Sequence, residues 1–348
     1  MEKLMRFTPL FAILFLIFSC NSPGSAAHDP LITDSVYGEK TACLLSQIAY
    51  SKTVAEDLDQ HLPGWKVVWD GQPRGGNYAF IATNGTGYAI SIRGSLLEFS
   101  WNAFQNWVYQ DLNVTSLRDW PHTNDSSKAR IAQGAWDGWQ NLCNMTDKNT
   151  GISMLAFLES NTIIETPILV VGHSLGGNLA TVYASYLWQH FRNNKKENNN
   201  INVITFAAPA AGNYYFAIDF NKKFPNSLRF ENKNDLVPKF PTSLGVSSLG
   251  DLYDSLPSAS AVVVGYKSST VPLSRAFTMI GFALNVLEIT AGGNYTQPCG
   301  EGKKFIFPLS GKNANNTIES WLSEAGYQHG MEQYARQLGT PVIGRNFQ

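Results

Sequence analysis

The stretch from Ile168 to Trp188, ILVVGHSLGGNLATVYASYLW, is the part of the chain that most constrains its fold. It opens with a continuous apolar run rich in β-branched residues, which is typical of a strand buried on both faces of a parallel sheet. It continues without a linker into a segment with helical spacing. Ser174 lies where the pattern changes, with glycines on both sides that allow a sharp turn because they lack a Cβ. The stretch therefore predicts a strand, a tight turn at Ser174 and a helix.

The remaining periodicity predicts an α/β protein with a mostly parallel central sheet, an antiparallel N-terminal hairpin, and helices on both faces. The hairpin is predicted because Asn84-Gly85 joins two alternating runs. The expected helices are 39–60, 151–164 and 176–191, and the expected strands are 65–70, 77–83, 87–93, 168–172, 201–209 and 227–232. No Pro-rich or Ser-rich linker interrupts the middle of the chain, so residues 28–348 are expected to form a single domain.

Residues 1–27 have the pattern of a signal peptide, with basic residues before an apolar run at 7–18. The run is shorter than the roughly 20 apolar residues that a membrane-spanning helix needs. Small residues up to Ala27 fit a cleavage site, and Cys20 offers lipoprotein processing as the alternative. The sequence therefore predicts a protein that is secreted or attached to the cell envelope.

Charge and cysteine spacing exclude some functional classes. The 348 residues carry a formal net charge of −1, so the charge gives no indication of a nucleic-acid partner. The spacing of Cys43, Cys143 and Cys299 matches no zinc pattern, and no cofactor or metal is implied. Export would permit a disulfide, but three thiols define no unique pair.

Ser174 lies in the sequence GHSLG, which fits the pattern G-x-S-x-G. On a strand–turn–helix this pattern presents a serine above the sheet, at the start of a helix. A serine hydroxyl is a poor nucleophile without a base, and the base needs a carboxylate to orient it. The sequence therefore predicts Ser174 as a nucleophile and directs the search to a histidine and an acid.

The histidine is predicted by chain order, which in such hydrolases is serine, then acid, then histidine. Of the six histidines, only His190 and His329 follow Ser174. His190 lies at the far end of the predicted helix, about 24 Å from Ser174 at 1.5 Å per residue. His329 remains as the candidate base.

The acid is expected on a loop beyond the carboxyl end of a strand, where the catalytic groups of such sheets lie. Asp235 follows the predicted strand 227–232 directly. Glu231 is a competitor that is expected to lie within the strand. Order alone also allows three further residues, Asp219, Asp251 and Asp254.

Five segments in succession resemble the motifs of the class 3 (fungal-type) lipase family: ISIRGS (90–95), VVGHSLGG (170–177), TFAAPAAGN (205–213), ENKNDLVPKFP (231–241) and YQHGMEQY (327–334). The resemblance extends over roughly residues 40–335 and implies an α/β-hydrolase fold. It also implies a triad of Ser174, Asp235 and His329, with Ser95 and the backbone N–H of Leu175 forming the oxyanion hole. The sequence departs from the family pattern at Ala207, at Gln133 and in the spacing within 106–112.

The expected activity is hydrolysis of carboxylic esters of lipids, with a lipid or other ester as the substrate and a membrane or lipid-droplet surface as an expected contact. A phospholipase or a feruloyl-type esterase on the same scaffold is the alternative within this chemistry. A non-catalytic lipid-binding protein is the alternative outside it, and the complete set of three catalytic residue types argues against it.

Two apolar segments remain to be placed. Residues 95–107 are a candidate lid, because Leu97, Trp101 and Phe104 would form one apolar face of a helix, although the same face could pack into the core. The run at 277–290 is expected to be a core helix rather than a surface that contacts lipid. It is too short to span a bilayer.

Overall fold

The computed structural model describes residues 36–95, 113–123, 128–194, 200–253, 257–266, 269–291, 294–300, 302–312 and 315–344. The chain divides into two units, Met1–Thr33 and Asp34–Gln348, and every described residue belongs to the second. The predicted signal peptide with Cys20 and Ala27, residues 96–107 of the candidate lid, and Asp254 lie outside the described residues.

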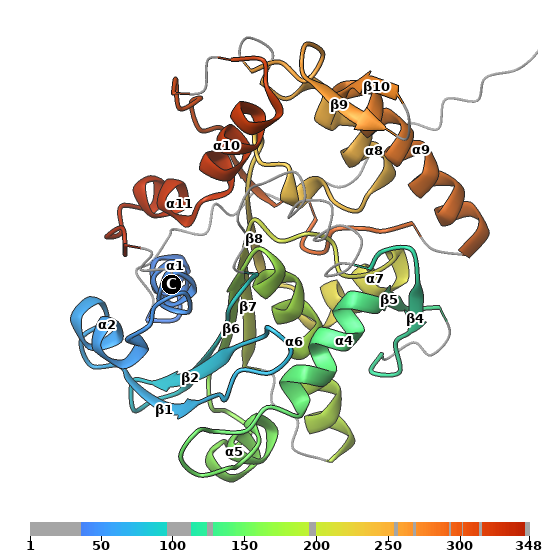
Figure 1. Cartoon of the computed structure of the whole chain (residues 1–348). Helices are drawn as coiled ribbons and strands as arrows, with labels where there is room; N and C mark the ends of the chain where they lie inside the picture. The colour runs from blue at the N-terminus through green and yellow to red at the C-terminus, as the bar shows by residue number, and fades with distance from the viewer. Residues whose placement is uncertain are drawn as a thin grey trace, which may run out of the picture. The chain divides into compact units, whose positions relative to one another are not determined.

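The described residues form a seven-stranded sheet with the strand order β1-β2-β3-β6-β7-β8-β11 (Figure 1). The strands are β1 (Lys66–Asp70), β2 (Ala79–Thr83), β3 (Tyr88–Ile92), β6 (Ile168–His173), β7 (Ile201–Phe206), β8 (Leu228–Asn232) and β11 (Lys303–Phe305). The first three pair antiparallel, and every pairing from β3 to β11 is parallel. The predicted hairpin between β2 and β3 is confirmed, with Asn84 Oδ1 accepting the backbone N–H groups of Thr86 and Gly87.

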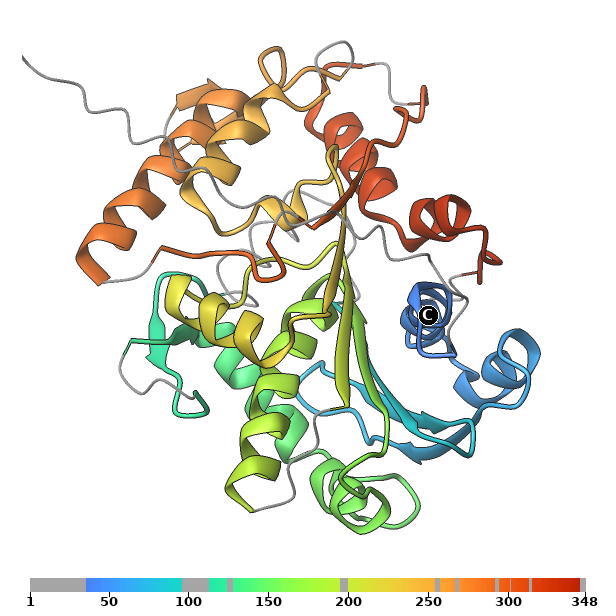
Figure 2. The ribbon, with the colours of Figure 1, turned by 180° about the vertical axis from the view of Figure 1, so that it is seen from behind.

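Helices cover both faces of this sheet, as Figure 2 shows from behind. The helices on one face include α1 (Glu39–Ile48) and α11 (Met331–Leu338), and those on the other include α4 (Gln133–Cys143) and α6 (Leu175–Asn193). Strand β6 contributes side chains to the core on both faces of the sheet. Leu169 and Val171 pack with the α1 side, and Ile168 and Val170 pack with the α6 side. All four are buried, which explains why the strand reads as an unbroken apolar run.

The other described elements surround this core. They are α2 (Val54–His61), β4 (Leu117–Asp119), β5 (Arg130–Ala132), α5 (Met154–Asn161), α7 (Tyr214–Lys223), η2 (Val237–Lys239), α8 (Ser243–Ser247), η3 (Ser248–Asp251), β9 (Val263–Tyr266), β10 (Ser269–Pro272), α9 (Leu273–Ala291) and α10 (Ile318–His329). Figure 1 shows α8, α9, β9 and β10 together, next to α10.

The prediction of one continuous helix over residues 39–60 is wrong. The chain forms α1 and α2, with a break between them. In the break, the side chain of Ser51 accepts the backbone N–H of Thr53 at 2.9 Å. Serine side chains compete with helical hydrogen bonds in this way. The break frees Tyr50 from the helix and lets its ring reach the end of β6.

Helix α9 differs from the core helix that its sequence predicts. Leu273, Phe277 and Leu284 are buried along one side. On another side Phe282 is 69% exposed and Met279 is 40% exposed. The helix therefore carries apolar residues on a buried side and on an exposed side. None of the described helices, α9 included, is long and apolar enough to cross a membrane.

The three cysteines of the described residues are free thiols. Burial raises the pKa of Cys43 and of Cys143 to about 12. Thiols with such pKa values stay protonated at neutral pH and are poor nucleophiles.

Candidate active site

Ser174 occupies the turn between β6 and α6. Its backbone has φ 60° and ψ −132°, a conformation that non-glycine residues rarely adopt and that typically costs about 1–3 kcal/mol. The backbone N–H donates to the carbonyl of Phe206 at 2.9 Å, which ties the turn to β7. The serine Oγ is buried and forms no hydrogen bond with any described residue. The side chain is therefore held at a strained turn without a structural hydrogen bond of its own.

Two glycines allow this turn to be so close to the sheet. A Cβ on Gly172 would lie 2.2 Å from the carbonyl oxygen of Gly176. A Cβ on Gly176 would lie 2.1 Å from the carbonyl oxygen of Ile92, at the end of β3. Because both neighbours are backbone atoms, any larger residue would push the first turn of α6 away from the strands. The sequence predicted this role of the glycines from the motif alone.

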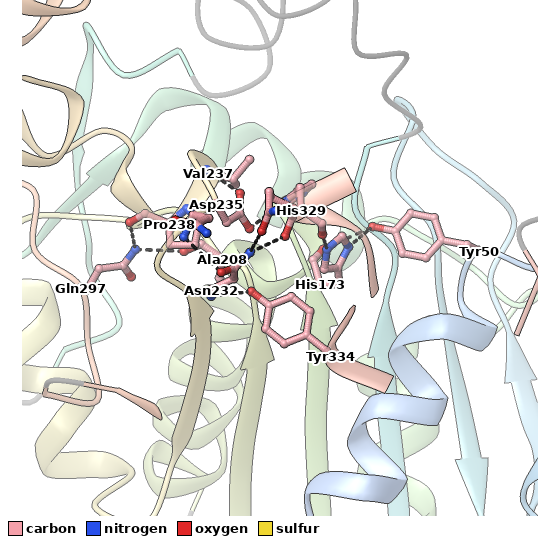
Figure 3. A network of polar contacts seen from close by, with 12 residues as sticks. Tyr50, His173, Ala208, Asn232, Asp235, Val237, Pro238, Gln297, His329 and Tyr334 are labelled. Atoms are coloured by element: carbon pink, nitrogen blue, oxygen red, sulfur yellow. Dashed lines mark hydrogen bonds and ion pairs between the residues drawn. The ribbon is translucent and has the colours of Figure 1, made fainter. Parts of the chain in front are cut away.

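Asp235 and His329 lie together, and His329 lies beside His173, as Figure 3 shows. The Nδ1 atom of His329, at the end of α10, is 2.8 Å from Oδ2 of Asp235. The other carboxylate oxygen accepts the backbone N–H of Val237 at 2.9 Å. Both side chains are almost fully buried. The structure thus brings together two residues that are 94 positions apart in the sequence.

Opposing effects act on the pKa of the Asp235 carboxyl. Burial raises the pKa of its carboxyl well above the usual value. The hydrogen bond from the Val237 N–H and the positive charge of Lys239 act in the other direction. A carboxylate in such a setting is strongly attracted to a cationic partner, and the imidazole of His329 is the group in direct contact.

His173 connects His329 to the nucleophile turn. The two imidazole rings lie against each other with their centroids 4.5 Å apart, and Nε2 of His173 is 2.9 Å from the carbonyl oxygen of His329. Nδ1 of His173 is 2.9 Å from the hydroxyl of Tyr50 (Figure 3). His329 is therefore in contact with the residue that directly precedes Ser174. Sequence reasoning named His173 only as part of the motif, and no sequence signal marked Tyr50.

A buried amide pair fixes the other side of His329. Asn232 is the last residue of β8. Its Nδ2 donates to the backbone carbonyl of Gln328 at 2.9 Å and to the side-chain Oε1 of Gln328 at 2.7 Å. Gln328 in turn donates through Nε2 to Oε1 of Glu324 at 2.8 Å. The backbone N–H of Asn232 donates to the hydroxyl of Tyr334 at 2.9 Å (Figure 3). Sequence reasoning missed this pair, because nothing in the local pattern connects positions 96 residues apart.

The competing residues are engaged elsewhere. Nε2 of His190 is 2.8 Å from Oε1 of Glu159, at the far end of α6. Glu231 forms an ion pair with Arg229. Asp219 pairs with Lys223 at 2.7 Å, and Asp251 is an exposed residue of η3. Within the described part of the chain, no group of three or more His, Cys, Asp or Glu side chains could hold a metal ion.

The two residues expected to form an oxyanion hole flank the turn. A Cβ on Gly94 would lie 3.0 Å from the Cβ of Ser174, so the residue before Ser95 is packed against the nucleophile turn. Ser95 itself is half-buried. Leu175 is the first residue of α6, and the first N–H groups of a helix have no acceptor within the helix. The backbone at both positions thus lies beside Ser174.

The departures at Ala207 and Gln133 have local structural explanations. Ala207 has φ 50°, a left-handed conformation that glycine adopts without steric cost. A glycine at this position would therefore be unstrained, whereas the alanine is not. Gln133 donates to Oδ1 of Asp137 at 2.7 Å and accepts a hydrogen bond from Arg118, at the start of α4. The altered segment 106–112 lies outside the described residues.

The chain is similar to known lipases in sequence and in structure. Residues 89–244 match the family model described as Lipase (class 3). A search of curated proteins gave no match. Among solved structures, the crystal structure of M37 lipase is similar with a TM-score of 0.67 and 22% identity, covering 87% of this chain and 93% of that chain. The lipase from Rhizopus microsporus var. chinensis has a TM-score of 0.46 and 18% identity, covering 61% of this chain and 71% of that chain.

The similarity to M37 lipase extends over most of both chains and confirms the predicted fold class, an α/β-hydrolase fold. The family match spans β3, β6 and β7 and reaches the loop after β8. It therefore contains Ser174 and Asp235 but ends before His329. The histidine is placed next to them by the geometry of α10.

Proposed function

We propose that this protein is a carboxylic ester hydrolase of the class 3 lipase family and that it cleaves the ester bonds of lipids through an acyl-enzyme formed on Ser174. The observation that carries the proposal is the buried pair of His329 and Asp235, in contact with the residue next to Ser174. A serine on a strained strand–helix turn beside such a pair is the arrangement that acyl transfer requires.

The reaction proceeds in two halves. In the first, Ser174 Oγ attacks the ester carbonyl carbon while His329 Nε2 accepts the hydroxyl proton. The tetrahedral intermediate collapses, the ester C–O bond breaks, and His329 returns the proton to the departing alcohol. In the second half, water attacks the acyl-enzyme with His329 again as the base, and the carboxylic acid leaves as Ser174 recovers its proton.

Asp235 assists through its contact with His329 Nδ1. The carboxylate accepts a hydrogen bond from the N–H at Nδ1. The neutral imidazole therefore keeps its lone pair on Nε2, which is the atom that must accept the serine proton. When the imidazolium forms, a fully buried carboxylate at 2.8 Å stabilises it with little screening by water. The Val237 N–H and the positive charge of Lys239 support the ionised carboxylate.

The backbone N–H of Leu175 and a donor from Ser95 are proposed to bind the oxyanion of the tetrahedral intermediate. The support is the position of Leu175 at the start of α6 and the packing of Gly94 against Ser174. Donors at a helix start are fixed in place before the charge develops, and losing one typically lowers turnover about 10²–10³-fold.

The substrate class is proposed to be acylglycerol-like lipids, with phospholipids and feruloyl esters as the alternatives on the same machinery. A panel of acylglycerols, phosphatidylcholine, feruloyl esters and p-nitrophenyl esters of increasing chain length tests this. We expect acylglycerols to be hydrolysed fastest, with no activity in the Ser174→Ala variant. A non-catalytic lipid-binding protein would bind the same lipids and release no acid from any of them.

Export and a lid belong to the same proposal. A signal peptide over residues 1–27 would deliver the enzyme to extracellular or envelope lipids, and the mass of the mature N-terminus would distinguish cleavage after Ala27 from lipidation at Cys20. A lid at residues 95–107 would raise activity once a short-chain ester exceeds its solubility limit. The Trp101→Ser variant would then show a smaller rise, whereas equal saturation curves in both proteins would exclude the lid.

A further inference from the structure

Two hollows on the surface adjoin near the catalytic acid. One, of about 580 Å³, is lined by Asp235 and by residues at the end of β8. The other, of about 590 Å³, lies between α8 and α9. Thr242, Tyr295 and Thr296 line both. The two hollows are therefore neighbours with a common wall, and together they are called the groove, which extends from the Asp235 side of the sheet to α9.

The end of the groove near Asp235 is cationic. Lys233, Lys239 and Lys304 line it together with Arg229, whose charge is balanced by Glu231. Lys239 is half-buried. Burial lowers the pKa of this ammonium and the nearby charge of Lys304 lowers it further, whereas the carboxylates of Asp235 and Asp251 act in the opposite direction. A chain with a net charge of −1 thus concentrates positive charge in this part of the groove.

The other end of the groove carries two large exposed apolar side chains among polar neighbours. Leu244 of α8 is 85% exposed and Phe282 of α9 is 69% exposed, and both line this end. The backbone here is well anchored: the Glu288 carboxylate accepts hydrogen bonds from the N–H and the hydroxyl of Ser243. Large apolar side chains exposed in a hollow favour an apolar ligand, because covering them removes their surface from water.

The wall between the two ends is rigid. Gln297 donates through Nε2 to the carbonyl of Pro238 at 2.8 Å and to that of Ala208 at 2.9 Å (Figure 3). The hydroxyl of Tyr295 donates to the carbonyl of Val114 at 2.9 Å. These bonds engage the neutral polar groups of the wall. The ammonium of Lys239 is therefore the donor at the Asp235 end of the groove on which the inference rests.

We propose that this groove binds a single-chain amphiphile with an anionic head, with the head at Lys239 and the hydrocarbon chain along Leu244 and Phe282. The inference rests on the proposed function, because ester hydrolysis of lipids releases fatty-acid carboxylates with this chemistry. A neutral lipid would bring no negative charge to the lysines of the groove, and a small anion would leave Leu244 and Phe282 exposed. The amphiphile satisfies both ends.

Binding there would affect the catalytic acid. The positive charge of Lys239 favours the ionised form of Asp235. An anion placed on Lys239 neutralises that charge and weakens its support for the carboxylate. The groove would thus let an accumulated product reduce the activity of the enzyme that releases it.

Binding of dodecanoate, below its critical micelle concentration, tests the proposal by calorimetry. The protein is first treated with a long-chain alkyl fluorophosphonate, so that the acyl pocket at Ser174 is filled and only a second site is measured. We expect one site, weakened at least about tenfold by Lys239→Met and by Phe282→Ser. The controls Lys52→Met and Ile164→Ser change an exposed lysine and an exposed isoleucine elsewhere and should leave binding unchanged.

Ligands with other heads sharpen the test. Dodecanol and dodecyltrimethylammonium should bind at least about tenfold more weakly than dodecanoate, and inorganic phosphate should not bind measurably. Dodecyl phosphate that binds more tightly than dodecanoate would identify a phosphate-headed lipid as the source of the anion, and the reverse order would identify a fatty acid. Equal binding of dodecanol and dodecanoate, or binding unchanged in either variant, would overturn the proposal.

Failure of the proposed function would be seen separately. A protein that does not react with the fluorophosphonate contradicts the role of Ser174, whatever its affinity for dodecanoate. Melting temperatures of the four variants establish that each is folded before its affinity is compared.

Discussion

The turn at Ser174 and the end of α10 at His329 supply neighbouring parts of one site by opposite means. The turn is built locally: the last residues of β6, two glycines and the first turn of α6 fix it within a few positions. His329 depends on distant partners, with Asp235 94 residues away, Asn232 96 residues from Gln328, and His173 156 residues away. A nucleophile can thus be encoded by a short motif, whereas its base must be docked by the whole fold.

The largest expected effect separates the two histidines that follow Ser174. His329→Ala should lower kcat by about 10⁶, as loss of the catalytic base does in subtilisin. His190→Ala should change kcat little, because His190 bonds Glu159 at the far end of α6. Steady-state kinetics on a soluble ester would decide. An inactive His190→Ala protein with an active His329→Ala protein would reverse the assignment.

The second-largest expected effect is at Asp235, where activity and stability should respond differently to substitution. Asp235→Asn should lower kcat by about 10⁴, because the amide cannot hold the correct tautomer of His329 or stabilise its charge. Burial raises the pKa of Asp235, so the folded state binds this proton more tightly than the unfolded state does. Its contribution to stability is therefore present at low pH and is lost as pH rises through the raised pKa.

Urea unfolding at several pH values measures this loss. The wild type should lose stability relative to Asp235→Asn between acidic and neutral pH, since the asparagine has no proton to release. A variant that becomes less stable than the wild type as pH rises would contradict the sign of the shift.

Much of the local half of the comparison could be predicted from the sequence. The apolar run of β6, the Asn84-Gly85 hairpin and the glycine turn are patterns of neighbouring residues, and the structure contains all three. Chain order left His329 by elimination, and the position after a predicted strand favoured Asp235, but neither showed how the two residues meet. The helix break at Tyr50 was missed, because the 3.6-residue periodicity of the segment does not reveal how Ser51 competes with the helical hydrogen bonds.

The distant half could not be predicted, because its partners are polar residues without a local pattern. Asn232 and Gln328 form a buried amide pair only once β8 and α10 are adjacent. The exposed apolar side of α9 was also missed. An apolar run in the sequence does not show whether the rest of the protein covers one side of the helix or all of it.

A smaller effect tests the docking of α10 directly. Asn232→Ala should lower kcat by about 10–100-fold with little change in KM, because a small displacement of His329 costs rate more than substrate binding. The matched control is Asn141→Ala, which removes another amide–amide bond, 2.9 Å to Asn77, away from the site. Equal losses of kcat in the two variants would show that Asn232 acts only through general stability.

The smallest expected effect concerns Lys239. Its positive charge lowers the pKa of Asp235, so Lys239→Met should let the pair of Asp235 and His329 take up a proton at higher pH. The acid limb of the pH profile of kcat/KM should therefore move to higher pH, with the plateau less affected. Lys52→Met is the control for loss of one positive charge. A limb that moves to lower pH would contradict the sign.

Labelling with a fluorophosphonate probe tests the central claim most directly, because the probe reacts with a serine only when a base activates it. We expect a single adduct on the peptide that contains Ser174. Labelling should be slowed strongly in His329→Ala and Asp235→Asn, and should proceed at the wild-type rate in His190→Ala. The absence of an adduct at Ser174 in folded protein, or labelling at an unchanged rate in His329→Ala, would contradict the account.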